Sequence, residues 1–600
     1  MTLRRWWPVL LIVPAFVLFL AYLRMSRAVT VNSDGASNAL QAWDLFHGNL
    51  LLRGWTLSDV SFYPTELIQY GLIQLVTGVT TDQIHIAAAL SWTLVVCLAA
   101  WLAHTVVAAK PNASVSTALP PAPPHSQPAT PTAPVTAGPD EPTTPTTTRD
   151  SPSPASTSPT ATASSSDPPG GATADGGPVS PLGRLKGALV GGGWLPVAIA
   201  VAIVVLPAPG YSYQTLLSSP NHTGSAVPLL ITWLLIDRAR DRPWLPFAVA
   251  IVLAWGAMGD PLITFVGAAP LIVVCAYRAL LARSARGPDA RLAAAGIASV
   301  ILSHGVLWLI ERLGGFRAPK PPIEFSPLEA WPDRAHAVTR MIGILFGTVR
   351  PGIQAPWVET TLQLVRLPGL LLAIVAVLVT AVAALRGTAD RVDAILAAAI
   401  VCDVAAEIVS TLPSDLMATR EVVPVLPMAA VLAARVTTRW LRGPSPTPLR
   451  VRLRVAAQSL SAAVLAVLLV GLAGYVPPRA APVEGQEAAD WLRSRGLRYG
   501  LGSYWVSNNI TVGTGRQVTV VPTLSGDGEL LGMCWQTHTD MFDPAKHDAR
   551  FVLLEKQRPF YGTPEDVVTQ YGPPVERKDF DLYVIFVYDK NLLEDFTPTC

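Results

Sequence analysis

Four polar side chains that lie far apart in the sequence are of types that could carry out one reaction together. They occupy polar connections next to apolar runs: Asp34, His222, Asp260 and Arg420. A carboxylate can remove the proton of an attacking hydroxyl, and an arginine can hold a phosphate through charge-assisted hydrogen bonds. We therefore interpret Asp34 as a candidate general base, and the other three as candidates for binding substrate and lipid phosphate.

Simpler structural explanations exist for each of these residues. Asp34 precedes a glycine and could end a helix or form a turn. Arg420 could be an interfacial anchor whose apolar stem lies along the membrane. All four groups fall at the same outer face in the topology predicted below, and this convergence favours a site.

The segment 29–66 is more aromatic and acidic than a simple connection. Its aromatic and ionisable side chains alternate: Asp34, Trp43, Asp44, Phe46, His47, Trp55, Asp59, Phe62, Tyr63 and Glu66. Such a mixture suits a surface at the level of the lipid headgroups that also holds a polar substrate. Asp44 and Glu66 are second candidates for substrate or lipid-phosphate binding, and the alternative for each is a solvated or capping carboxylate.

Two acidic residues, Asp403 and Glu407, lie inside an apolar run. They are four residues apart and therefore share one helix face. A charged side chain at the centre of a bilayer costs about 3 kcal/mol on insertion scales, so such residues usually face a cavity or a partner. They could line a groove for a lipid-linked substrate or a proton path, and a neutral hydrogen-bonded pair is the structural alternative.

The composition of the chain is that of a membrane protein. Of its 600 residues, 50% are hydrophobic and 14% are charged, and the mean hydropathy is +0.39. Because soluble proteins carry about 25% charged residues, this composition excludes a cytosolic enzyme. The net charge of +2 provides no basic field for nucleic acid. Repeated apolar runs of about 20 residues predict one large membrane domain with soluble appendages.

Eleven apolar runs predict a polytopic α-helical membrane protein with about eleven spans. The runs lie near 6–23, 84–107, 188–207, 225–237, 244–258, 262–281, 291–313, 362–386, 392–412, 420–436 and 456–475. Arg4 and Arg5 precede the first run and place the N-terminus in the cytoplasm, so the C-terminus lies outside. The run 225–237 is short and could be half of a broken helix.

Composition divides the chain into four parts. Residues 1–110 hold the first two spans and the long outer loop, and 181–476 hold the remaining spans. The segment 111–180 is rich in Pro, Ser and Thr and is predicted to be a disordered cytoplasmic insertion. Residues 477–600 alternate helical and strand patterns, which predicts an extracytoplasmic α/β domain.

The C-terminal domain also contains the two cysteines predicted to lie outside the membrane. Cys534 and Cys600 could form a disulfide in an oxidising compartment. Cys600 is the last residue and could instead be frayed. The sequence has no CxxC motif or His/Cys cluster typical of zinc.

This layout resembles the GT-C superfamily, membrane glycosyltransferases that use polyprenyl-phosphate sugars. The resemblance rests on the cytoplasmic N-terminus, about eleven spans, an outer loop that opens with Asp34, and a C-terminal extracytoplasmic domain. The loop, the stretch 499–505 and the Pro/Ala/Arg-rich composition also resemble actinobacterial proteins. The family often has a paired acidic motif in this loop, where this chain has Ser33-Asp34-Gly35. The resemblance therefore leaves open whether the chain uses a divalent cation, Mg²⁺ or Mn²⁺, and it assigns no ligands to one.

The resemblance implies sugar transfer at the outer face of the plasma membrane. The donor would be a polyprenyl-phosphate-linked sugar, and the acceptor a glycan, lipid or protein of the cell envelope. A transporter or flippase of envelope precursors is an alternative, which predicts inverted repeats and polar residues through the whole membrane depth. A non-catalytic GT-C-like scaffold is the second alternative.

Overall fold

The computed structural model describes most of the chain. The described ranges are 3–108, 193–218, 221–239, 242–281, 286–320, 324–350, 357–412, 415–443, 447–476 and 480–599. The predicted insertion 111–180 and Cys600 lie outside them. Cys534 lies within them and is disulfide-bonded. Because Cys600 is not among the described residues, its pairing with Cys534 stays a prediction. The cysteines of the apolar runs, Cys97, Cys275 and Cys402, are free.

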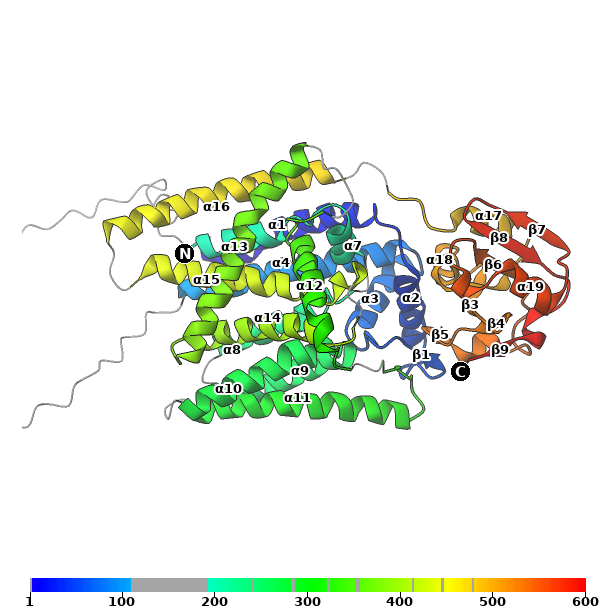
Figure 1. Cartoon of the computed structure of the whole chain (residues 1–600), viewed down its shortest axis with the longest axis horizontal. Helices are drawn as coiled ribbons and strands as arrows, with labels where there is room; N and C mark the ends of the chain where they lie inside the picture. Colours follow the sequence, from blue (N-terminus) through cyan, green and yellow to red (C-terminus); the bar gives the residue numbers. More distant parts are fainter. Residues whose placement is uncertain are drawn as a thin grey trace, which may run out of the picture. The chain divides into compact units, whose positions relative to one another are not determined.

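Each of the predicted apolar runs coincides with a helix in the described residues (Figure 1). These helices are α1 (Leu3–Ser26), α4 (Asp82–Ala108), α6 (Leu195–Val204), α8 (Ala226–Arg238), α9 (Leu245–Gly259), α10 (Ala269–Leu281) with the preceding π-helical turn η1 (Thr264–Ala268), α11 (Arg286–Arg312), α13 (Trp357–Leu385), α14 (Arg391–Val409), α15 (Val425–Arg442) and α16 (Pro448–Tyr475).

Five helical segments of the described chain are long and apolar enough to cross a membrane, by length and composition. They are Asp82–Val106, Thr264–Leu281, Arg286–Arg312, Trp357–Leu385 and Pro448–Tyr475. The helix α8, on the run that could be half of a broken helix, has only 13 residues. The total of eleven spans and the orientation of the chain therefore stay predictions.

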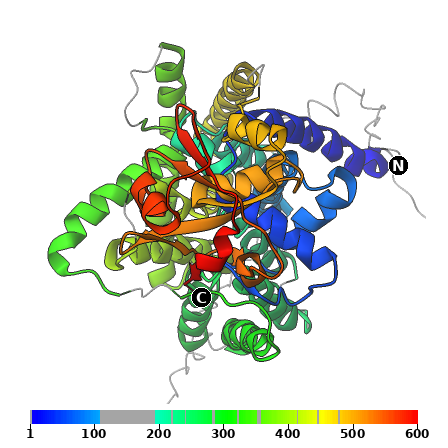
Figure 2. The same cartoon turned by 90° about the vertical axis from the view of Figure 1, so that its right-hand side faces the viewer.

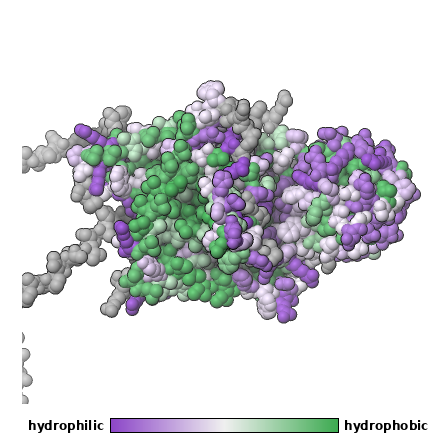
Figure 3. All heavy atoms as spheres, in the orientation of Figure 1, coloured by the Kyte–Doolittle hydropathy of each residue, from purple (hydrophilic) through white to green (hydrophobic). Residues whose placement is uncertain are grey.

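Hydrophobic side chains cover the outside of the helices, as Figure 3 shows for one face. On α13, Leu371, Val375 and Leu378 are each more than half exposed. Soluble monomers rarely expose apolar patches larger than a few hundred Å². Since the helices satisfy their own backbone hydrogen bonds, this surface suits the hydrocarbon of a bilayer.

A buried ion-pair network joins three helices at the ends predicted to lie inside. Arg435 of α15 is 1% exposed, and its Nε lies 2.6 Å from Oδ1 of Asp393 on α14. Its Nη2 lies 3.1 Å from Oδ1 of Asp237 on α8. Thr105 of α4 also accepts a hydrogen bond from Arg435 Nη1, at 2.8 Å. Arg435 therefore holds these helices together.

Removing the arginine of this network should destabilise the helical part. Arg435→Gln removes the buried positive charge that pairs with Asp393 and Asp237, and breaking a buried ion pair costs about 3–5 kcal/mol. We expect a clearly lower midpoint in thermal unfolding of the detergent-solubilised protein, followed by size-exclusion chromatography. The control is Arg386→Gln, which changes an exposed arginine between α13 and α14. Equal midpoints for both variants would contradict a structural role for the network.

Short helices lie between the apolar helices on the side predicted to be outside. They are α2 (Ser33–Phe46), α3 (Glu66–Thr77), α7 (Tyr211–Leu217), η4 (Met417–Arg420) and α12 (Trp331–Leu345). Asn32 caps α2 by accepting a hydrogen bond from the Gly35 amide at 2.9 Å, so α2 begins at Ser33 beside Asp34. Both α7 and α12 pack against η4, and this packing positions Arg420 at the end of η4.

A seven-stranded sheet forms the C-terminal part, drawn in orange and red in Figure 2. Its strand order is β7-β8-β6-β2-β3-β4-β9. The strands are β2 (Tyr499–Ser503), β3 (Thr519–Gly526), β4 (Glu529–Gly532), β6 (Phe551–Glu555), β7 (Glu576–Asp579), β8 (Tyr583–Val587) and β9 (Thr597–Pro598). The central strand β2 runs parallel to β3 and β6, with Leu501 opposite Val521 and Val552. The helices are α17 (Gln486–Ser494), α18 (Tyr504–Gly513) and α19 (Pro564–Tyr571).

The first outer loop is hydrogen-bonded to this C-terminal part. The Ser33 hydroxyl donates to the Tyr504 carbonyl at 2.5 Å, and Asn509 Nδ2 donates to the Val31 carbonyl at 3.0 Å. A two-stranded sheet pairs β1 (Trp55–Thr56) with β5 (Thr537–His538) in antiparallel register. The loop and the C-terminal part therefore position each other's side chains.

Candidate functional site

A buried histidine between two carboxylates forms the centre of the candidate site. His222 Nδ1 lies 2.5 Å from Asp260 Oδ2, and His222 Nε2 lies 2.7 Å from Glu421 Oε2. Burial alone would lower the pKa of His222, but the charges and hydrogen bonds of the two carboxylates raise it well above its ordinary value. His222 is therefore a cation that donates through both ring nitrogens.

Three connections that are distant in sequence meet at this histidine. His222 precedes α8, Asp260 follows α9, and Glu421 follows η4. Asp260 is fixed further by the Ser225 hydroxyl and by the Leu262 amide, which donates to Oδ1 at 2.9 Å. The ends of these helices that are predicted to lie outside are thus held by one chain of charge-assisted hydrogen bonds.

Glu421 joins the histidine to Arg420. Arg420 Nε donates to Glu421 Oε1 at 3.1 Å. Burial alone would raise the pKa of Glu421, but the charge of His222 and hydrogen bonds from His222 and Arg420 lower it to about 2. The Arg420 side chain is 43% exposed, so its guanidinium is accessible at the edge of the cluster. Glu421 was not expected from the sequence, where its only signal is its position directly after Arg420.

Asp34 lies in the first turn of α2 and faces the C-terminal part. Its Oδ1 accepts hydrogen bonds from the Tyr504 hydroxyl and, at 3.2 Å, from Gln536 Nε2. Burial raises the pKa of Asp34, while the Tyr504 hydrogen bond and the charge of Arg420 act in the opposite direction. A carboxylate with a raised pKa is a stronger proton acceptor. Neither Tyr504 nor Gln536 was expected from the sequence.

A second carboxyl group of the first loop, Asp59, interacts electrostatically with Asp34 and with the histidine cluster. Burial raises its pKa, and the charges of Glu421, His222 and Arg420 all act on it. Arg420 in turn interacts with both Asp34 and Asp59. The structure therefore brings Asp34, His222, Asp260 and Arg420 into one charged region, with Asp59 and Glu421 added.

Glu66 belongs to the same region. It begins α3 and is 7% exposed, and burial raises its pKa to about 7. The charge of Asp260 also raises this pKa, and that of His222 lowers it. A Cβ on Gly224 would lie 1.7 Å from Glu66 Oε1, so the glycine lets the carboxyl group reach the backbone beside His222.

Asp44 is not part of this region. It lies ten residues after Asp34 in α2, about 15 Å farther along the helix axis. Its Oδ2 accepts hydrogen bonds from Asn49 Nδ2 at 2.7 Å and from Trp55 Nε1 at 2.8 Å. These contacts brace the turn after α2. Asp44 therefore makes structural contacts, and its role in binding substrate or lipid phosphate stays a prediction.

The acidic pair of α14 is buried below the histidine cluster. Asp403 and Glu407 are 1% and 2% exposed. Among the described residues, neither oxygen of Asp403 has a hydrogen-bond partner, and Glu407 Oε2 has none. The charges of His222 and Glu421 act on both carboxyl groups. The described residues therefore do not show the hydrogen bond between Asp403 and Glu407 that the structural alternative expected.

No metal site is apparent in the described ranges. No group of three or more His, Cys, Asp or Glu side chains there is arranged to hold a metal ion. His222, Asp260 and Glu421 are already joined to one another by hydrogen bonds. The described residues therefore provide no evident set of ligands for Mg²⁺ or Mn²⁺.

An apolar groove of about 550 Å³ begins at the charged region. It runs along α3 from Glu66 to Thr77, a length of about 17 Å. Its walls are mainly apolar side chains of α3, α4 and α8: Ile68, Leu72, Ile73, Val76, Ile86, Leu90, Leu94 and Val227. Gly224 and Trp255 also line it, so the groove reaches the connection that carries His222.

Comparisons with known proteins identify no family for this chain. No protein-family model matches it, and no curated protein matches it. Among solved structures, the crystal structure of ArnT from Cupriavidus metallidurans bound to undecaprenyl phosphate aligns with 98% of this chain and with 98% of its own chain. The two are 11% identical, with a TM-score of 0.49. This likeness decides neither family nor activity, so the conclusions below rest on the geometry of this chain.

Glu66 should give the site a pH dependence near neutrality. Because its pKa is about 7, the carboxyl group ionises as the pH rises through that value and adds a negative charge beside the groove. We expect the affinity for farnesyl methyl phosphate, whose single negative charge does not titrate in this range, to fall severalfold between about pH 6 and pH 8. Microscale thermophoresis of the purified protein measures this affinity.

The variant Glu66→Gln should bind this ligand with nearly the same affinity across the range, because the amide does not ionise. The control Glu487→Gln, which changes an exposed residue of α17, should keep the wild-type pH dependence. A Glu66→Gln variant with the wild-type profile would assign the titration to another group.

Proposed function

We propose that the chain is a GT-C-type membrane glycosyltransferase that moves a sugar from a polyprenyl-phosphate donor to a cell-envelope acceptor at the outer face of the plasma membrane. The observation that carries the proposal is the continuity of the apolar groove with a charged region containing an accessible arginine and a carboxyl group of raised pKa. A prenyl chain fits the groove, and its phosphate would lie near Arg420.

The geometry supports a direct role for Asp34. An acceptor hydroxyl gives its proton to Asp34 as its oxygen attacks the anomeric carbon of the donor sugar. The bond between that carbon and the phosphate oxygen breaks, and the phosphate leaves with the bonding electrons. Arg420 stabilises the charge that develops on the phosphate. His222 and Glu421 are positioning residues, since they hold Arg420 and do not contact the reacting atoms.

The cation considered from the sequence enters no step of this mechanism. A divalent cation would supply further charge stabilisation of the phosphate. The residues described here that act on the phosphate and on the proton are Arg420 and Asp34. The acceptor can be a glycan, a lipid or a protein.

Asp34→Asn should abolish transfer while leaving the protein inserted in the membrane. Loss of a general base typically slows a reaction by about 10²–10⁴-fold. The measurement is mass spectrometry of lipid-linked sugars and envelope glycans in a deletion strain that expresses each variant. The control is Asp44→Asn, on the same helix, because asparagine can still accept the Trp55 hydrogen bond.

The outcomes separate the proposed enzyme from its alternatives. Donor accumulation and glycan loss with Asp34→Asn, but not with Asp44→Asn, supports the transferase. Wild-type transfer with Asp34→Asn removes Asp34 from the mechanism. If the deletion strain has unchanged lipid-linked sugars and glycans, the result points to the non-catalytic scaffold. If precursor accumulates on the inner leaflet, the result points to the flippase.

Arg420→Ala should weaken binding of the lipid phosphate. Loss of a charge-assisted hydrogen bond costs about 1.5–3 kcal/mol, which corresponds to roughly 10- to 150-fold in affinity. Binding of farnesyl phosphate to the purified protein provides the measurement. The control Arg340→Ala changes an exposed arginine of α12. An unchanged affinity with Arg420→Ala would reduce this residue to an interfacial anchor.

A further inference from the structure

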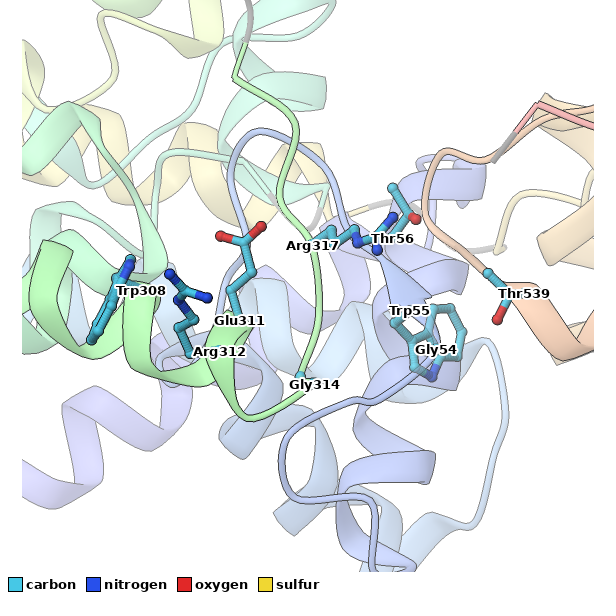
Figure 4. Close-up of a pocket in the computed structure, with 10 residues that line it drawn as sticks. Gly54, Trp55, Thr56, Trp308, Glu311, Arg312, Gly314, Arg317 and Thr539 are labelled. Carbon is cyan, nitrogen blue, oxygen red and sulfur yellow. The ribbon is translucent and has the colours of Figure 1, made fainter.

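A second cavity, of about 600 Å³, lies where the first outer loop, the end of α11 and the C-terminal part meet (Figure 4). It is lined by aromatic, charged, hydroxyl and glycine residues: Trp55, Thr56, Trp308, Glu311, Arg312, Arg317 and Thr539, with Gly54, Gly314 and Gly315. In Figure 4, Glu311 and Arg312 project from the last turn of α11, and Arg317 lies beside Thr56. This volume falls within the range of about 300–1,000 Å³ that is typical of small-molecule sites.

Backbone hydrogen bonds form the cavity before any ligand binds. The Arg317 amide donates to the Trp55 carbonyl at 3.1 Å, and the Leu57 amide donates to the Arg317 carbonyl at 2.8 Å. The Thr539 amide donates to the Gly54 carbonyl at 2.8 Å, which fixes the third wall. A Cβ on Gly315 would lie 2.8 Å from the Leu51 carbonyl oxygen, so a glycine is needed for this close approach.

The lining matches the two sides of a sugar ring. The exposed indole of Trp308 offers an apolar surface for the C–H side of a sugar, while Trp55, which is 4% exposed, forms part of the wall. The hydroxyl side needs paired donors and acceptors, which Arg317, Thr56 and Glu311 provide. The groove along α3 is lined instead by apolar side chains and suits a prenyl chain. The two cavities therefore differ in chemistry.

The charge of the lining favours an acidic ligand. Arg312 and Arg317 contribute two positive charges, and Glu311 contributes one negative charge. Arg312 lies over the Trp308 ring, 5.5 Å from its centroid, which holds its guanidinium near the rim. Guanidinium groups bind carboxylates and phosphodiesters through two parallel hydrogen bonds. An acidic sugar would place such a group at this rim.

The cavity is connected to the reactive region through the outer loop. Thr56 lies three residues before Asp59, so the backbone between them spans at most about 10 Å. Asp59 interacts with Arg420. We infer that this cavity is a binding subsite for an acidic saccharide, a glycan that carries carboxylate or phosphodiester groups. This inference rests on the proposed function and specifies the class of its acceptor.

Binding of defined oligosaccharides tests the subsite without requiring transfer. The full chain, reconstituted in phosphatidylcholine nanodiscs, is titrated by calorimetry with hexagalacturonate and with neutral maltohexaose at low salt. We expect measurable binding of the acidic hexasaccharide, at least tenfold weaker binding of the neutral one, and loss of affinity as salt screens the charges. The double variant Arg312→Gln/Arg317→Gln should lower the affinity for hexagalacturonate at least tenfold.

Matched variants make each outcome decisive. Arg291→Gln changes an exposed arginine at the other end of α11 and should bind hexagalacturonate as the wild type does. Equal affinities for the double variant and the wild type would overturn the subsite, as would equal binding of both saccharides. Binding of phosphatidylglycerol nanodiscs without binding of hexagalacturonate would assign the cavity to a lipid headgroup.

Farnesyl phosphate binding separates this inference from the proposed function. The double variant should keep wild-type affinity for this donor analogue, because Arg312 and Arg317 do not line the groove. A double variant that loses the saccharide but keeps the analogue supports the subsite. Loss of analogue binding in Arg312→Gln/Arg317→Gln would show that the two cavities are not independent and would overturn the assignment.

Discussion

The buried charge on His222 is the constraint on which the outer face of the molecule depends. A buried cation is stable only when opposite charges compensate its desolvation, and here Asp260 and Glu421 provide them. Each carboxylate in turn needs the histidine, so the connections before α8, after α9 and after η4 must come together. With Arg420 added, the four charges sum to zero. Arg420 reaches Glu421 through Nε, which leaves its two terminal amino groups outside this contact and available for the proposed phosphate.

The C-terminal part completes the site from the other side. Asp34 is held by Tyr504 and Gln536, which lie about 500 positions later in the sequence. The hydrogen bonds from Ser33 and Asn509 join the same two segments. Because the loop and the C-terminal part fix each other, the position of the candidate base depends on both. The cavity bounded by Thr539 and Trp55 arises at the same junction, so one docking surface organises both the base and the second cavity.

The sequence predicted the helices well, because long apolar runs leave few alternatives, and it placed Asp34, His222, Asp260 and Arg420 in the connections where they meet. It could not identify Glu421, Tyr504 or Gln536, because a hydrogen-bond partner distant in sequence leaves no local pattern. The contacts of Asp44 with Trp55 and Asn49 are local ones that brace the turn after α2, and its binding role stays a prediction. Strand β2 has no clear apolar pattern in the sequence, because Gly500 and Gly502 interrupt it. A Cβ on either would come within 2.7 Å of the carbonyl oxygens of Phe551 and Leu553.

The pKa shifts in the charged region suit the proposed binding of a phosphate near several carboxyl groups. Burial raises the pKa of Asp34, Asp59 and Glu66, that of Glu66 to about 7, and a protonated Glu66 can donate a hydrogen bond to phosphate instead of repelling it. Asp34 must nevertheless be ionised to act as a base, and the charge of Arg420 and the Tyr504 hydroxyl favour that form. When a phosphate neutralises Arg420, the ionised form of Asp34 loses part of this stabilisation, and its affinity for a proton rises. Donor binding would therefore strengthen the base at the moment when the acceptor hydroxyl must lose its proton.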